Sequence, residues 1–201
     1  AYPRISIPII LAVSMALLSL LLGILLVHSR KTKEIRVMSE TDALTGLYNR
    51  RAAEDHISRQ MQEDGKNPDC VRPLISIDLD KFKQVNDTYG HLEGDALLIA
   101  VADTLRTSVR SYDIVGRIGG DEFVVYLSNV TDRQNAMAVA EKLCRVIRGL
   151  STMKKEWSNI SASIGISFAD HPDIKMEELY ISADKAMYSA KGNGRDQYQT
   201  L

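Results

Sequence analysis

The sequence predicts a mixed α/β domain that follows a single apolar helix, and three observations support this fold class. Residues 5–27 contain no charged side chain. From Thr41 onward, runs with apolar residues at helical spacing alternate with short apolar runs of strand length. Within residues 114–127, a Gly-Gly pair separates two short apolar runs, which is typical of a β-hairpin. The composition, with 45% apolar and 25% charged residues, is ordinary for a folded chain.

The apolar segment is long enough to cross a membrane as one helix, because a helix rises about 1.5 Å per residue and the hydrocarbon core is roughly 30 Å thick. It is too long for the apolar region of a typical signal peptide and lacks a small-x-small cleavage site. Four Lys and Arg residues follow it closely, whereas only Arg4 precedes it, so the C-terminal side is expected to be cytoplasmic. We therefore predict a transmembrane region at residues 1–29 (helix at about 5–27), a helical linker at 30–41 and a cytoplasmic domain at 42–201.

The elements of this domain follow in order. Apolar residues at helical spacing predict a first amphipathic helix, and they are Leu44, Leu47, Tyr48, Ala52 and Ile57. Residues 73–80 form a short apolar strand that ends in carboxylates. Further helices are predicted at residues 92–109, 136–150 and 176–190, and further strands at 160–168 and 197–201. Gly192 and Gly194 are suitable stop signals after the last helix.

Charge and metal-ligand spacing exclude several classes of function. The net charge of −1 gives no basic field for nucleic acid, so no nucleic-acid partner is expected. Cys70 and Cys144 form no CxxC pair, which argues against a disulfide framework and a cysteine zinc site. The four histidines show no HExxH spacing.

Carboxylates occur at two places that a sheet could bring together. Asp78 and Asp80 end the first strand and point to one face, although an isolated pair of this kind is more often a solvated strand end. Asp121 and Glu122 lie on the Gly-Gly turn and would repel each other without a cation. If the hairpin pairs beside the strand, Asp78 and Asp121 could share Mg²⁺, which typically binds one or two carboxylates plus substrate phosphates.

Basic residues suited to a polyphosphate lie elsewhere in the chain. Lys191 and Arg195 flank a glycine-containing turn, and Lys83 is close in sequence to the carboxylate strand. Basic residues at a helix end also complement the helix dipole, so this signal is weak alone. Together with the carboxylates it indicates a metal-dependent nucleotide enzyme and identifies neither the base nor the product.

Six ordered segments of residues 41–201 resemble the motifs of GGDEF-domain diguanylate cyclases. They are DALTGLYNR (42–50), DLDKFKQVND (78–87), YGHLEGD (89–95), GGDEF (119–123), SIGIS (163–167) and ADKAMYSAKGNGR (183–195). The resemblance implies a central, mostly antiparallel sheet flanked by helices, similar to class III nucleotide cyclases and polymerase palms. It also implies condensation of two GTP molecules into cyclic di-GMP across a homodimer, with Mg²⁺ or Mn²⁺ as cofactor.

The resemblance assigns roles to matching positions. It implies metal ligation by Asp78, the Leu79 carbonyl, Asp121 and Glu122. Asp121 or Glu122 would help to deprotonate the ribose hydroxyl, and Lys83 would stabilise the transition state. The residues that it implies at the substrate are Asn86, His91 and Asp95 at or near guanine, Lys191 and Arg195 at the phosphates, and Phe82, which is more typical of a core or pocket wall. Asp95 favours guanine, since a carboxylate accepts from N1–H and N2–H₂, which argues against an adenine-containing product.

The resemblance also implies regulation, and the apolar segment with the basic residues after it implies a location. Arg110 and Asp113 form an RxxD motif that five residues separate from Gly119, the spacing of the family's product-inhibition site; the alternative is a surface ion pair. Cyclic di-GMP would then be both product and allosteric ligand. The expected location is the bacterial cytoplasmic (inner) membrane, with the catalytic domain in the cytoplasm. A catalytically silent cyclic di-GMP receptor or protein-interaction module is the alternative function.

Overall fold

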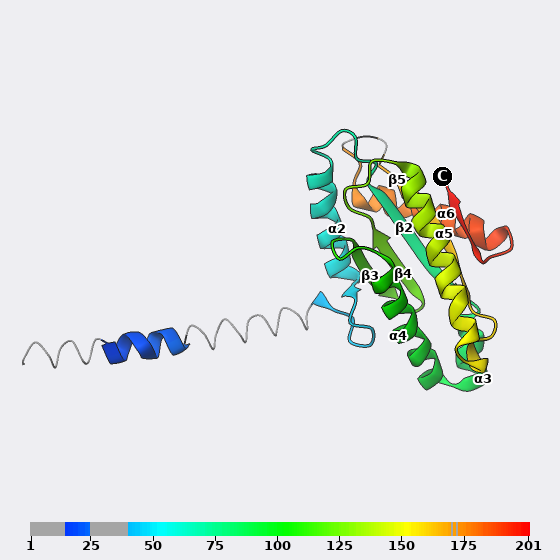
Figure 1. Cartoon of the computed structure of the whole chain (residues 1–201), viewed down its shortest axis with the longest axis horizontal. Helices are drawn as coiled ribbons and strands as arrows, with labels where there is room; N and C mark the ends of the chain where they lie inside the picture. The colour runs from blue at the N-terminus through cyan, green and yellow to red at the C-terminus, as the bar shows by residue number, and fades with distance from the viewer. Residues whose placement is uncertain (1–14, 25–39, 170, 172) are drawn as a thin grey trace, which may run out of the picture. The chain divides into compact units, whose positions relative to one another are not determined.

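A computed structural model of the chain describes residues 15–24, 40–169, 171 and 173–201 (Figure 1). The chain divides into two units, Ala1–Ser39 and Glu40–Leu201. In the first unit, residues 15–24 are helical. Within the described ranges, no helix is both long enough and apolar enough to span a bilayer. The remainder of the predicted membrane segment and residues 30–39 of the predicted linker lie outside the described residues.

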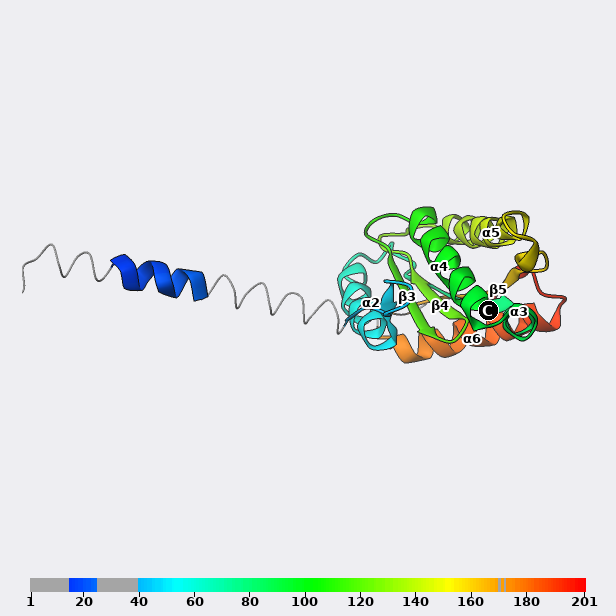
Figure 2. The same ribbon diagram turned by 90° about the horizontal axis from the view of Figure 1, so that it is seen from below.

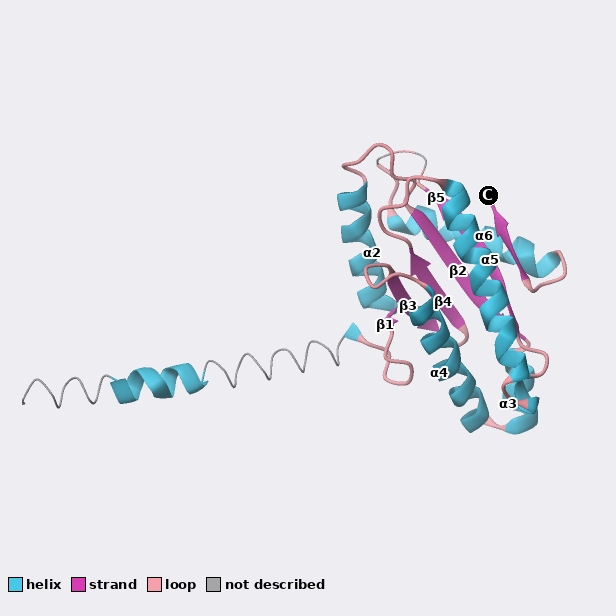
Figure 3. Cartoon of the chain, in the orientation of Figure 1, coloured by secondary structure: helices cyan, strands magenta, loops and turns pink. Residues whose placement is uncertain are grey.

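The second unit is a six-stranded sheet with helices on both faces (Figure 3). Its helices are α2 (Arg50–Asp64), α3 (Phe82–Tyr89), α4 (His91–Ser108), α5 (Arg133–Gly149), α6 (Met176–Gly192) and the short 3₁₀ turns η1 (Leu150–Thr152) and η2 (Lys155–Trp157). Its strands are β1 (Tyr48–Asn49), β2 (Pro73–Asp80), β3 (Ile114–Gly119), β4 (Glu122–Tyr126), β5 (Ser161–Phe168) and β6 (Gln197–Thr200).

The strand order is β1-β3-β4-β2-β5-β6. The central strands β3, β4, β2 and β5 pair antiparallel, whereas β1 and β6 add to the two edges in parallel. The predicted mostly antiparallel sheet is therefore confirmed. The hairpin over residues 114–127 is also confirmed, and it lies directly beside β2.

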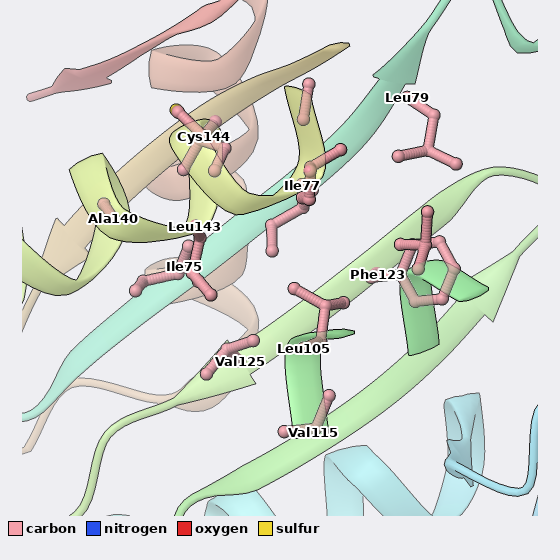
Figure 4. Packing of buried hydrophobic residues seen from close by; sticks show 14 of the residues in the cluster. Ile75, Ile77, Leu79, Leu105, Val115, Phe123, Val125, Ala140, Leu143 and Cys144 are labelled. Carbon is pink, nitrogen blue, oxygen red and sulfur yellow. The ribbon is translucent and has the colours of Figure 1, made fainter. Parts of the chain in front are cut away.

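The two sheet faces are covered by different helices, as Figure 2 shows for α4 and α5 on one side and α6 on the other. Alternate residues of β2 divide between them. Ile75, Ile77 and Leu79 pack with α4 and α5 in the larger apolar cluster (Figure 4). Leu74 packs with α2 and α6 in a second cluster. Asp78 lies four residues after Leu74 on the same strand, so both side chains point to the same face. This is the face that α2 and α6 cover.

The start of the first helix was predicted incorrectly. Residues 42–47 form a turn, in which Asp42 accepts hydrogen bonds from the Thr45 backbone N–H (2.9 Å) and hydroxyl (2.6 Å). The chain then adds β1 to the sheet, and α2 begins only at Arg50. Asn49 caps this helix by accepting from the Ala52 N–H at 3.0 Å. Leu47 is buried in the sheet region rather than on a helix face.

Candidate active site

The end of β2 and the β3–β4 hairpin bring the predicted metal-ligating residues together. Asp78 is the register partner of Glu122 on the neighbouring strand. The Leu79 N–H donates to the Asp121 carbonyl at 3.3 Å, which holds the acidic turn against the strand. Three carboxylates from two elements therefore gather at one end of the sheet.

Burial and the neighbouring negative charges shift the pKa values of Asp78 and Glu122. Burial raises the pKa of Asp78 above its ordinary value of 3.8, and the charges of Asp121 and Asp80 act in the same direction. Burial also raises the pKa of Glu122 above 4.5, with further contributions from Asp78 and Asp121. A bound cation would relieve this repulsion, because it favours the ionised forms.

Lys191 supplies the positive charge at this site. Its Nζ lies 2.7 Å from Asp78 Oδ2, and this ion pair lowers the pKa of Asp78 against the effect of burial. The contact depends on how closely α6 approaches β5. A Cβ built on Gly165 of β5 would lie 2.0 Å from the Ala183 carbonyl oxygen of α6, so only glycine permits this packing.

Asp80 differs from Asp78 although the two residues point to the same face. Its side chain is buried and accepts hydrogen bonds from the hydroxyls of Ser161 and Ser163, each at 2.7 Å, and from the Asp196 N–H at 3.1 Å. Asp80 thus joins β2, β5 and the turn before β6. Arg195 is exposed on that turn, with Nε 3.7 Å from Asp80 Oδ1. Its guanidinium remains available to solvent and to a ligand.

Helices α3 and α4 carry the residues predicted to recognise the base. Asn86 lies on α3 and Asp95 in the first turns of α4. The two helices meet very closely, since a Cβ built on Gly94 would lie 1.9 Å from Asn86 Oδ1. This contact places the Asn86 amide against the residue that precedes Asp95.

The other residues predicted near the substrate differ in exposure. Lys83 and His91 are exposed on the first turns of α3 and α4. Phe82 is partly buried and packs against the larger apolar cluster. Its placement agrees with the pocket-wall or core interpretation.

Arg117 is a residue near the site whose structural role the sequence interpretation missed. Its guanidinium donates to the Gly120 carbonyl on the acidic turn (2.7 and 3.0 Å) and pairs with Asp42 at 3.0 Å. Arg50 Nε donates to the Ile118 carbonyl at 3.0 Å, close to the same turn. The signal in the sequence was an Arg two residues before the Gly-Gly pair, but its ion-pair partner Asp42 lies 75 residues away.

The predicted inhibitory motif forms a compact turn between α4 and β3. The two carboxylate oxygens of Asp113 accept from the backbone N–H groups of Arg110 (2.8 Å) and Ser128 (3.0 Å). The Arg110 side chain is exposed, with its guanidinium carbon 5.7 Å from the centre of the Tyr112 ring. Both motif residues line a cavity of about 600 Å³ that Lys142 and Asn135 of α5 also border.

The donor set suits a magnesium ion that a nucleotide helps to hold. Within the part of the chain that the structure describes, no group of three or more His, Cys, Asp or Glu side chains could hold a metal ion. A cation at this site would be held by one or two of the carboxylates of Asp78, Asp121 and Glu122, together with the Leu79 carbonyl and substrate oxygens. Mg²⁺ commonly binds in this way, with one or two carboxylates plus phosphates.

Comparison with known proteins identifies the family. A family model described as "Diguanylate cyclase, GGDEF domain" matches residues 39–197. The chain belongs to the GGDEF family. The described GGDEF unit, Glu40–Leu201, agrees closely with the matched range.

Two curated proteins illustrate the sequence similarity. The GGDEF chain is 39% identical over 170 residues to the bifunctional diguanylate cyclase/cyclic di-GMP phosphodiesterase MucR of Pseudomonas aeruginosa, covering 85% of this chain and 24% of that protein. It is 36% identical over 176 residues to the diguanylate cyclase DgcS of Shewanella oneidensis, covering 87% and 57%. The chain therefore spans between a quarter and just over half of the length of these relatives.

The fold also matches solved GGDEF structures. The GGDEF domain of DgcB from Caulobacter crescentus, crystallised in complex with c-di-GMP, superposes with a TM-score of 0.71 at 27% identity, covering 80% of this chain and 95% of that one. Diguanylate cyclase SiaD from Pseudomonas aeruginosa, in complex with its activator SiaC, gives a TM-score of 0.72 at 29% identity, covering 95% and 76%.

Proposed function

We propose that this GGDEF domain condenses two GTP molecules into cyclic di-GMP and releases two pyrophosphates. The observation that carries the proposal is the register pairing of Asp78 with Glu122, with Lys191 only 2.7 Å from Asp78. This arrangement combines the acidic groups that phosphoryl chemistry needs with a cation suited to the leaving phosphates. The diguanylate cyclase names of MucR and DgcS support the same reaction.

Each part of the site has a role in this mechanism. Asp95 accepts from guanine N1–H and N2–H₂, and Asn86 donates to or accepts from the same edge. Lys83, Lys191 and Arg195 bind phosphate oxygens. Asp121 or Glu122 takes the proton from the attacking 3′-hydroxyl. Mg²⁺ or Mn²⁺, held by Asp78, Asp121 and the Leu79 carbonyl, would offset the charge that develops on the phosphates.

One domain provides one GTP site, so two copies must meet for the reaction to finish. In the proposed homodimer, the 3′-hydroxyl of each GTP attacks the α-phosphorus held by the other domain. Each attack forms one phosphodiester bond and breaks the bond to pyrophosphate. Activity is therefore expected to rise with protein concentration more steeply than in simple proportion.

The test is product analysis of the purified chain with GTP and Mg²⁺, beside Asp121→Ala. Cyclic di-GMP from the natural chain, absent with the variant, is the expected result. No product at high protein concentration, even when two copies are fused to a dimeric partner, would contradict the enzyme proposal and indicate a receptor. Direct binding of cyclic di-GMP would then be measured.

Product inhibition through Arg110 and Asp113 forms a second part of the proposal. An exposed guanidinium beside a cavity of about 600 Å³ can pair with a phosphate or stack on a guanine. Asp113 is held in place by two backbone N–H groups and retains lone pairs that can accept from a base. Arg110→Ala is expected to weaken inhibition by added cyclic di-GMP at least tenfold, while initial rates without product remain similar.

Residues 5–27 are proposed to anchor the domain to the bacterial inner membrane, with the domain in the cytoplasm. The support is the uncharged stretch and the basic residues that follow it. The test is fractionation of cells that express the chain, followed by protease treatment of spheroplasts. Recovery in the soluble fraction, or cleavage of the domain from outside, would contradict this location.

A further inference from the structure

Helix α3 is weakly anchored for a segment that carries three residues predicted to lie at the substrate. Val85 is the only fully buried residue of α3. Its N-cap residue is Lys81, which has a positive φ of 63° and makes no side-chain capping hydrogen bond. The elements that pack most extensively against α3 are α4 and the turn η2. The placement of Asn86 therefore depends on how these neighbours hold α3.

The η1–η2 loop, defined here as residues 150–160, packs on the outer side of α3. Trp157 is buried within it, with 4% of its surface exposed. Glu156 and Ile160 of the loop face Val85 and Tyr89 of α3 across a small hollow of about 70 Å³. The loop continues directly into β5, where Ser161 donates to buried Asp80. One end of the loop is thus fixed to the core of the site.

Lys154 connects this loop to α4. Its Nζ lies 2.8 Å from Glu93 Oε1, and the Glu93 side chain is only 22% exposed. The same ammonium lies 4.8 Å from the centre of the Trp157 ring, which keeps the lysine over the buried indole. Glu93 directly precedes Gly94, the residue in closest approach to Asn86, and lies two positions before Asp95.

We infer that Lys154 and Glu93 are positioning residues that set the spacing between Asn86 and Asp95. The loop supports α3 through the turn η2 and Ile160, and the Lys154–Glu93 ion pair ties α4 to the same support. Helices α3 and α4 are consequently held at a fixed distance from each other. This distance determines how Asn86 and Asp95 meet the guanine edge. This inference rests on the proposed function, because it concerns the proposed guanine site.

The test compares GTP with ITP, which lacks the N2 amino group that Asp95 is proposed to bind. Lys154→Met and Glu93→Gln each remove the ion pair with little change in side-chain size. Each is expected to lower the ratio of kcat/KM for GTP to that for ITP about two- to fivefold, in line with the modest energy of a partly exposed pair. The fall should lie mainly in KM, since the groups that act on the α-phosphate are unchanged.

Two controls separate positioning from a general loss of stability. Lys66→Met breaks a more exposed Lys–Glu pair, Lys66–Glu63 at 2.6 Å, at the end of α2, and should leave the GTP/ITP ratio unchanged. The exchanged pair Glu93→Lys with Lys154→Glu should restore the ratio. An unchanged ratio in both single variants, or equal losses for the two nucleotides, would overturn the inference.

Binding measurements distinguish failure of this inference from failure of the proposed function. Dissociation constants for non-hydrolysable GTP and ITP analogues are measured by calorimetry with the same variants of the full chain. If the natural chain makes no cyclic di-GMP, the proposed function fails, and the ratio of dissociation constants still decides the inference. A weaker preference for GTP in Lys154→Met than in the natural chain supports the positioning inference. A ratio of dissociation constants equal to that of the natural chain overturns the inference.

Discussion

Lys191 Nζ lies 2.7 Å from Asp78 Oδ2, so the last turn of α6 carries a cation to the acidic end of β2. The two residues are more than 100 positions apart in sequence, and they come from the sheet and from a helix that covers one of its faces. The pair balances one negative charge at a site where burial raises the pKa values of Asp78 and Glu122. Lys191 therefore acts on the ionisation of Asp78 in addition to its proposed contact with phosphate.

Lys191→Met is expected to reduce kcat/KM for GTP at least about tenfold, because a hydrogen bond between charged groups is lost. It should also raise the pKa of Asp78 further, since Lys191 opposes the effect of burial. Asp78 must be ionised to hold a cation. On acidification, the activity of Lys191→Met should therefore begin to fall at a higher pH than the activity of the natural chain. The measurement is the pH dependence of kcat/KM, with exposed Lys185→Met on α6 as the control. Identical acid limbs for the natural chain and Lys191→Met would contradict this coupling.

Glu122→Gln is expected to abolish cyclase activity and to stabilise the domain in the absence of divalent cations. Burial and the charges of Asp78 and Asp121 raise the pKa of Glu122 in the folded state above 4.5, so the folded state binds the proton more tightly than the unfolded state. The contribution of Glu122 to the free energy of unfolding consequently falls as the pH rises above 4.5 and the folded-state carboxyl loses its proton. The gain at pH 7 should be less than about 1 kcal/mol, because water still screens this partly exposed group.

Thermal unfolding of Glu122→Gln and the natural chain at pH 7 and pH 4.5 checks this expectation. The difference in unfolding temperature between the two proteins should be smaller at pH 4.5, because the Glu122 carboxyl of the natural chain takes up a proton as the pH falls. Glu141→Gln, at an exposed position of α5, is the matched control and should change little. A destabilised Glu122→Gln at pH 7 would show that the carboxylate is needed for the fold itself.

Local patterns were sufficient to predict most elements of the domain. The apolar spacing of α5 and α6, and the Gly-Gly pair between β3 and β4, determine those structures within short segments. The pattern failed over residues 42–49, where Leu47 and Tyr48 fit helical spacing but lie in a turn and an edge strand. The Asn49 cap, together with pairing of β1 to distant β3, outweighs that spacing.

The different environments of Asp78 and Asp80 could not be predicted from the sequence. Both are carboxylates on the same face of β2, and nothing in the sequence of residues 73–80 distinguishes their roles. Asp80 is buried because hydroxyls of Ser161 and Ser163, on β5, satisfy it. Asp78 instead faces Lys191. Such partners become known only when strands far apart in sequence are placed side by side.

Gly165→Ala is expected to destabilise the domain by about 2 kcal/mol or more, the usual scale of overpacking in a dense core. A Cβ at this position would lie 2.0 Å from the Ala183 carbonyl oxygen and 2.2 Å from the Met187 backbone nitrogen. Because these atoms belong to the backbone of α6, the whole helix must shift away from β5. Lys191 would move with it, so activity should fall more than the folded fraction does. Urea unfolding and kcat/KM for GTP measure the two effects, and a variant as stable as the natural chain would contradict the close packing.

Gly94→Ala tests the helix contact that the proposed guanine site requires. Inside a helix, replacing Gly by Ala would ordinarily stabilise by up to about 1 kcal/mol. Here the added Cβ would lie 1.9 Å from Asn86 Oδ1, so the Asn86 amide must leave its position beside Asp95. KM for GTP should rise at least about tenfold while the free energy of unfolding changes little, because the clash is with a movable side chain. Gly149→Ala makes the same substitution in helical backbone of α5 with no atom within 4 Å, and should leave KM unchanged. A Gly94→Ala variant with the natural KM for GTP would mean that Asn86 does not hold the base, and the guanine site would have to lie elsewhere.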